Sequence, residues 1–129
     1  MSRSDIIIKG KFPGIIANEA NRLMSDSLTE EMRGYLFEGA NGFQMVAWVG
    51  EKGGPSPMHK HKYDEYCVVI QGWCDVEMED GETYRMLPGD ECLLPAGVMH
   101  GGRHSPDYRA IDVFANRRFH YANKKDPKK

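Results

Sequence analysis

Two histidines and a glutamate precede an apolar run near the middle of the chain. The stretch GGPSPMHKHKYDEYCVVIQG covers residues 53–72 and contains His59, His61 and Glu65. In an extended chain, residues two apart point to the same face, with their Cα atoms about 7 Å from each other. The imidazoles of His59 and His61 can therefore bind one ion, and the sequence indicates a metal site that begins with this pair.

Glu65 can join the two histidines only if the chain turns. Six fully extended residues would carry Glu65 roughly 20 Å from His59, whereas the bonds around a metal ion are close to ~2 Å long. The short polar segment Lys62-Tyr63-Asp64 lies between His61 and Glu65. We expect this segment to turn, so that Glu65 opens the next strand beside the histidines.

His100 is a fourth candidate ligand, because it follows the turn signal Pro95-Ala96-Gly97. Three imidazoles and one carboxylate suit iron, manganese, nickel, cobalt or zinc, and they suit calcium poorly. We expect one divalent first-row transition metal ion per chain, bound by His59, His61, Glu65 and His100. An octahedral ion with four protein ligands keeps two positions for a bidentate substrate, or for a substrate and dioxygen.

Glu65 itself and three residues near the ligands are candidates for catalysis or for packing. Glu65 can loosen from the metal and act as a base, and His104 or Tyr66 can move a proton if they face the same cavity. A half-exposed loop histidine is an equally good interpretation of His104. Cys67 lies two residues after Glu65 and shares its face of the strand. Packing as a small buried hydrophobe is favoured for Cys67 over soft metal ligation or a redox role.

Length and composition indicate one soluble domain. The chain has 129 residues, the size of one ordinary domain, and its formal net charge of −2 favours neither nucleic acid nor an anionic membrane. Cys67, Cys74 and Cys92 have no disulfide-framework spacing, which is typical of reduced thiols in a cytoplasmic protein. No signal-peptide pattern and no membrane-length apolar run is present. The basic residues at 122–129 are expected to form a flexible, solvated tail.

Short apolar stretches alternate with turn signals from about residue 43 onward, which is typical of an all-β sandwich or barrel. The strand candidates are Phe43–Val49, Glu65–Gln71, Trp73–Glu79, Glu82–Leu87, Glu91–Leu94 and Tyr108–Phe114. Before them, DIIIKG and GIIA can form strands, and SLTEEMRGYLF can hold one helical turn capped by Ser27.

The histidines lie in two spaced motifs that resemble those of the cupin superfamily. The first cupin motif has glycine, His-x-His, glutamate and glycine at set intervals, and the second has glycine, Pro-x-Gly, histidine and asparagine. The matching residues are Gly53, His59, His61, Glu65 and Gly72 for the first motif, and Gly89, Pro95, Gly97 and His100 for the second. His104 stands where the second motif has its asparagine. This departure leaves the metal ligands in place but changes the hydrogen bonding beside them.

The resemblance implies an antiparallel jelly-roll barrel of the small single-domain cupin type. The barrel would cover about residues 43–114 of one domain, residues 1–129, after an irregular N-terminal extension at residues 1–40. The resemblance also implies a homodimer whose four matching ligands bind one metal ion inside the barrel. The expected function is that of a metal-dependent enzyme, a dioxygenase, lyase, decarboxylase or isomerase, acting on a small carboxylate or sugar-like metabolite. The alternative is a non-catalytic module that binds or senses such a molecule, and neither nucleic acid nor membrane is an expected partner.

Overall fold

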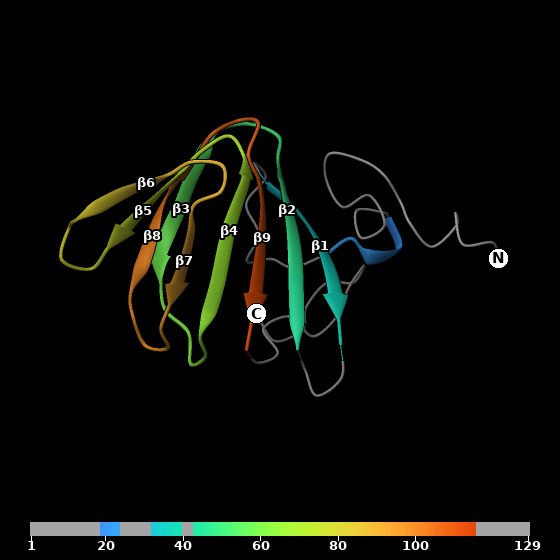
Figure 1. Cartoon of the computed structure of the whole chain (residues 1–129), viewed down its shortest axis with the longest axis horizontal. Helices are drawn as coiled ribbons and strands as arrows, with labels where there is room; N and C mark the ends of the chain where they lie inside the picture. The colour runs from blue at the N-terminus through green and yellow to red at the C-terminus, as the bar shows by residue number, and fades with distance from the viewer. Residues whose placement is uncertain (1–18, 24–31, 40–42, 116–129) are drawn as a thin grey trace.

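The computed structural model describes residues 19–23, 32–39 and 43–115, and this part of the chain consists mostly of antiparallel strands (Figure 1). The elements are the short 3-10 helix η2 (Glu19–Asn21) and the strands β1 (Met32–Glu38), β2 (Gln44–Gly50), β3 (Gly54–His59), β4 (Glu65–Gln71), β5 (Cys74–Met78), β6 (Thr83–Met86), β7 (Glu91–Leu94), β8 (His100–His104) and β9 (Arg109–Phe114). They form a five-stranded sheet, ordered β1-β2-β9-β4-β7, and a four-stranded sheet, ordered β3-β8-β5-β6. The predicted all-β architecture, built from antiparallel strands, is confirmed.

Side chains alternate between the interior and the outside along the central strands. In β9, Ala110, Asp112 and Phe114 are buried, and the residues between them are only partly so. The register of β9 against β4 places Asp112 opposite Cys67 and Phe114 opposite Glu65. Since apolar residues normally fill such positions, the two inward carboxyl groups mark this part of the interior as unusual.

Two strands of the four-stranded sheet had no recognisable signal in the sequence. β3 contains Pro55 and Pro57, which lack a backbone N–H and are tolerated because β3 is an edge strand. β8 contains Gly101 and Gly102, and a Cβ atom on Gly101 would lie 2.8 Å from the carbonyl oxygen of Ser56 in β3. Prolines and glycines, which usually argue against a strand, are therefore compatible with this pair of strands.

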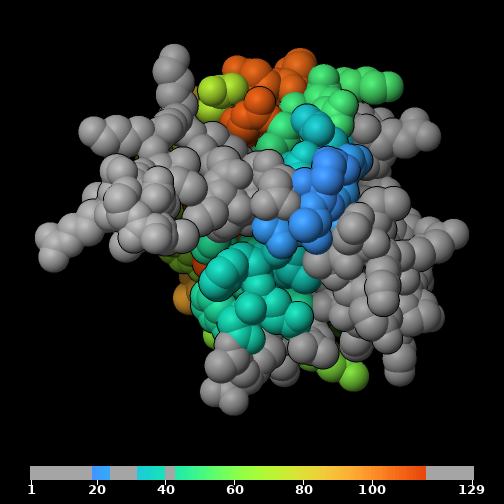
Figure 2. All heavy atoms as spheres, turned by 90° about the vertical axis from the view of Figure 1, so that its right-hand side faces the viewer, coloured from blue at the N-terminus to red at the C-terminus, as the bar shows by residue number. Residues whose placement is uncertain are grey.

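The N-terminal region contains a strand where an irregular extension was expected. β1 pairs with the whole length of β2, from Met32 opposite Gly50 to Glu38 opposite Gln44. Figure 2 shows β1 beside the segment that contains η2, and the amide of Leu23 donates to the carbonyl of Gly34 at 2.8 Å. The expected strands DIIIKG and GIIA, and the helical turn after Ser27, lie outside the described residues. The following stretch, Met32–Glu38, is extended and not helical.

The strands predicted from residue 43 onward are all present, and each of their ends differs from the predicted one by at most one residue. Glu65–Gln71 and Glu91–Leu94 have the predicted bounds. Among the described residues, no helix has the length and apolar character needed to cross a membrane.

Gly102 gives a test of how closely β8 and β5 pack. Its φ is +146°, and a Cβ atom would lie only 1.7 Å from the carbonyl oxygen of Asp75. Gly81 also has a positive φ, +91°, but its Cβ would meet no atom within 4 Å. We expect Gly102→Ala to lower the free energy of unfolding by at least about 1 kcal/mol more than Gly81→Ala, since overpacking costs roughly 1–3 kcal/mol. Urea unfolding of both variants measures the difference, and equal losses would contradict the close contact.

Candidate metal centre

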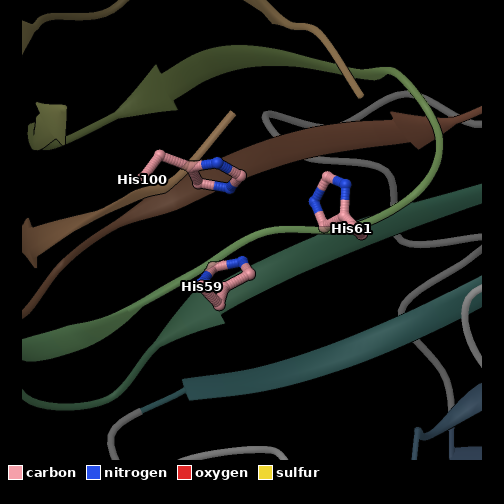
Figure 3. A group of neighbouring side chains, drawn as sticks. All are labelled: His59, His61 and His100. Carbon is pink, nitrogen blue, oxygen red and sulfur yellow. The ribbon is translucent and has the colours of Figure 1, made fainter. Parts of the chain in front are cut away.

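Three histidines gather inside the barrel, from segments that are distant in sequence (Figure 3). His59 ends β3 and pairs directly with His100, the first residue of β8. His61 follows β3 by two residues, and its ring centroid lies 5.2 Å from that of His100. One ring nitrogen from each histidine lies within 4.8 Å of the others, so the three form a group that could hold a metal ion.

The backbone sets the orientation of each imidazole ring. Every Nδ1 atom lies within hydrogen-bonding distance of a carbonyl oxygen two residues away. The distances are 2.9 Å from His59 to Pro57, 3.0 Å from His61 to Tyr63 and 3.0 Å from His100 to Val98. A carbonyl can only accept, so each Nδ1–H is the donor and each neutral ring has its lone pair on Nε2. Histidines that bind metals in proteins are oriented by the same kind of contact.

Glu65 lies beside the group because the chain bends where the sequence predicted a turn. The bend at Lys62 and Tyr63 carries the chain from β3 to β4, which belongs to the other sheet. Oε1 of Glu65 then lies 2.8 Å from Nε2 of His61 and 3.8 Å from Nε2 of His100. The predicted turn is thereby confirmed.

Glu65 and His61 are in contact through two atoms that can each bind a metal ion. A carboxylate oxygen and an imidazole lone pair are both acceptors, so a proton or a metal ion must lie between these atoms at 2.8 Å. Adjacent ligands of an octahedral ion with bonds of about 2.05 Å lie about 2.9 Å apart. The spacing and the donor types therefore fit a divalent first-row metal ion.

Two hydrogen bonds hold the His61–Glu65 bend against the turn that precedes His100. The amide of Ala96 donates to Oδ1 of Asp64 at 2.9 Å, and the amide of Gly97 donates to the carbonyl of His61 at 2.8 Å. The two motif turns are therefore joined directly. This contact sets the position of His61 relative to His100.

Asp112 is a buried acid beside Glu65 that the sequence interpretation did not identify. Its side chain is in hydrogen-bonding contact with Glu65, Cys67 and Trp48. Burial, and then the negative charge of Glu65, raise the pKa of Asp112 well above its ordinary value. Burial beside Glu65 therefore favours the protonated form of Asp112. The signal was present in the alternation of strand Arg109–Phe114, which places an acid among the inward positions.

A cavity of about 460 Å³ extends from the three histidines between the two sheets. Glu65 and His104 line it, and His104 is only 3% exposed. The buried interpretation of His104 is therefore correct, and the exposed-loop alternative is not. Tyr66 does not line the cavity, because it alternates with Glu65 and Cys67 along β4 and its hydroxyl contacts Glu91. The structure thus brings His104, but not Tyr66, to the same cavity as the histidines.

All three cysteines line the cavity as free thiols. Cys67 packs in a core cluster with Val69 and Tyr108, as its small apolar character predicted. A hydrogen bond with Cys92, and then burial, raise the pKa of Cys67, whereas the same bond lowers the pKa of Cys92. Burial raises the pKa of Cys74 to about 11. The Cys92 thiol is therefore the most acidic of the three.

A family model described as the cupin domain matches residues 47–114, more than half of the chain. Among solved structures, KdgF from Halomonas sp. is 30% identical with a TM-score of 0.64, over 70% of this chain and 84% of that one. Ectoine synthase from P. lautus is 21% identical with a TM-score of 0.67, over 87% of this chain and 79% of that one. An RmlC-like cupin from Shewanella frigidimarina is 20% identical with a TM-score of 0.66, over 80% of this chain and 91% of that one. The latter two likenesses concern the fold alone.

One curated protein with a similar sequence is quercetin 2,3-dioxygenase from Bacillus subtilis (strain 168). It is 37% identical over 62 residues, which are 47% of this chain. The chain covers only 18% of the length of that dioxygenase. The likeness is therefore confined to a segment about the size of the barrel motifs.

The alkylation rates of the three thiols test the order of their pKa values in the cavity wall. At pH 8 a thiol with a pKa of about 11 is a thiolate in about one molecule in a thousand, and only the thiolate reacts with alkylating agents. We expect iodoacetamide to modify Cys92 at least about tenfold faster than Cys74, with Cys67 the slowest. Peptide mass spectrometry over time measures the three rates, and urea-unfolded protein, in which they should converge, is the control. Modification of Cys67 at the rate of Cys92 would contradict the assignment.

Proposed function

Since this chain belongs to the cupin domain family, as its two histidine motifs predicted, we propose that it is a metal-dependent enzyme acting on a small polar molecule. One divalent first-row ion, iron, manganese, nickel, cobalt or zinc, would be held by His59, His61, His100 and Glu65. The observation that carries the proposal is the convergence of the three imidazoles, since one ring nitrogen from each lies within 4.8 Å of the others. A set of lone pairs arranged in this way has little structural purpose without an ion.

The bound ion would act as a Lewis acid toward oxygen atoms of the substrate. Four protein ligands leave an octahedral ion room for two further oxygen atoms, which suits a carboxylate with a neighbouring hydroxyl or carbonyl group. The cavity of about 460 Å³ beside the histidines has space for such a molecule. A small hydroxy acid or a sugar-like compound is therefore the proposed class of substrate.

Asp112 and Glu65 would have different roles at the site, Asp112 as a hydrogen-bond donor and Glu65 as a proton acceptor. Asp112, whose pKa is raised by burial and by the charge of Glu65, would keep its proton and donate a hydrogen bond to the Glu65 carboxylate. Glu65 thereby remains the negative group of the ligand set, and it is placed to accept a proton from a substrate hydroxyl. Tyr66 has no part in this proposal, because its side chain lies outside the cavity.

The likeness to quercetin 2,3-dioxygenase supports a dioxygen-dependent reaction as the first class to test. Lyase, decarboxylase and isomerase reactions form the second class, because they need the same Lewis acid without dioxygen. We further propose that the protein works as a cytoplasmic homodimer, following the family pattern and the free state of its three cysteines.

Metal content tests the ligand set directly. Protein purified without chelators or nickel resin is expected to hold about one equivalent of a divalent metal per chain, and His59→Ala and His100→Ala are expected to lose it. His104→Gln is the matched control, because His104 lies in the same cavity but outside the group of three histidines. Elemental mass spectrometry measures the content. Full occupancy in both alanine variants would refute the ligand assignment.

Oxygen dependence tests the class of reaction. The metal-loaded protein would be incubated with a panel of small hydroxy acids, hydroxyketones and sugars, with and without dioxygen. We expect substrate loss together with oxygen uptake, measured by chromatography and an oxygen electrode, and no loss without dioxygen. Turnover without dioxygen would assign the enzyme to the second class. Binding without any turnover would contradict the enzymatic proposal and favour a sensing module.

A further inference from the structure

His104 carries a buried acceptor that the rest of the site does not use. Its Nδ1 lies 3.0 Å from the carbonyl oxygen of Ser105, so Nδ1–H is the donor and the lone pair of the neutral ring is on Nε2. Within the described residues, this Nε2 atom is buried and has no hydrogen-bond partner. Buried polar atoms are nearly always paired, because an unpaired one loses its contact with water and gains nothing in return.

The neighbours of His104 do not supply the missing donor. Its ring lies beside that of Tyr108, with centroids 5.5 Å apart, and Cys74 is directly opposite it on β5. The Tyr108 hydroxyl lies 3.9 Å from Sγ of Cys67 and also contacts the Cys74 thiol. None of these groups is a hydrogen-bond partner of Nε2, so the missing donor would come from the cavity, as a water molecule or as a hydroxyl group of a bound substrate.

His104 and the three histidines line one wall of one cavity. His100 and His104 are the two ends of β8, and their even spacing turns both side chains to the same side. Gly102 lies between them and has no side chain, and Val76 opposite it on β5 also lines the cavity. Four strand residues span roughly 13 Å. The path from the metal ligands to His104 is thus lined by one face of these two strands.

We propose that Nε2 of His104 accepts a hydrogen bond from a hydroxyl group at the far end of the substrate. This inference rests on the proposed function and narrows its substrate class. The substrate would be two-ended, with chelating oxygen atoms at His59, His61 and His100 and a hydroxyl at His104. Subtracting the metal bonds and one hydrogen bond from the length of the strand segment leaves roughly 6–8 Å between the two ends.

The chemistry of Nε2 excludes other groups at that end of the substrate. A carboxylate, phosphate or ketone would present a second acceptor to the lone pair, and the two would repel each other. A donor is therefore required at this end, and in the proposed class of hydroxy acids and sugar-like compounds that donor is a hydroxyl group.

Three mandelates of nearly equal size test the assignment. Mandelate has the chelating hydroxy acid, 4-hydroxymandelate adds a hydroxyl at the far end, and 4-methoxymandelate replaces that hydroxyl by a group that cannot donate. With zinc-loaded protein in a calorimeter, we expect 4-hydroxymandelate to bind about threefold to tenfold more tightly than mandelate, and 4-methoxymandelate more weakly than either.

Variants of His104 show whether this residue is the cause. His104→Phe keeps a ring but has no acceptor, so the preference for 4-hydroxymandelate is expected to fall below about twofold. His104→Gln has a carbonyl oxygen that can accept and is expected to keep a preference above about twofold. Tyr84→Phe, on exposed β6 outside the cavity, is the control and should match the unmodified protein.

Nitrogen NMR gives a second readout that does not depend on affinity. In zinc-loaded protein labelled with ¹⁵N-histidine, 4-hydroxymandelate should shift the Nε2 signal of His104 and mandelate should not. If His104→Phe fails to fold, His104→Gln and this spectrum decide the matter. Equal binding of the first two ligands, or a preference that survives in His104→Phe, would overturn the role of His104 alone. Metal-loaded protein that binds no mandelate would overturn the proposed chelation as well.

Discussion

The antiparallel pairing of His59 with His100 is the contact on which the candidate site depends. It brings the ends of two motifs that are far apart in the chain to opposite positions on β3 and β8. The bend after His61 then adds Glu65 from the other sheet, and the bond from Ala96 to Asp64 holds this bend in place. A shift of one residue in the register would turn His59 or His100 away from the interior. The two glycines of β8 matter for the same reason, since they allow β3 and β5 to approach it closely.

The interior of the barrel is divided between packing and chemistry. Phe114, Val46, Leu36 and Leu23 form one apolar cluster, and Val69, Ala110 and Met86 belong to another. Glu65, Asp112, His100 and His104 are buried as well, at positions that apolar side chains could fill. Buried polar groups of this kind seldom add to stability. Their concentration around one cavity is therefore better explained by binding than by folding.

The sequence was most informative where spacing is tied to chemistry. The candidate ligands His59, His61 and Glu65 and the turn between them could be predicted because two imidazoles and a carboxylate can meet only if the chain folds back. His100 was predicted from the turn signal that precedes it. The strands β4 and β7 were equally clear, because turn residues bound them on both sides. β3 and β8 were missed since their prolines and glycines are acceptable only at a sheet edge or a close backbone contact, which are properties of the tertiary structure. β1 was missed for a similar reason, because its burial depends on a strand that follows it in the chain. Asp112 was overlooked although the alternation of its own strand places it among the inward positions.

The bend at Lys62 and Tyr63 also has a mechanical consequence. His59 and His100 belong to the four-stranded sheet, whereas Glu65 belongs to the five-stranded sheet. An ion bound to all three would join the two layers near one end of the barrel, much as a cross-link does. Its binding free energy would then oppose the separation of the layers, because the unfolded chain offers no such arrangement of ligands. Metal supply would in this way govern the lifetime of the folded barrel as well as its chemistry.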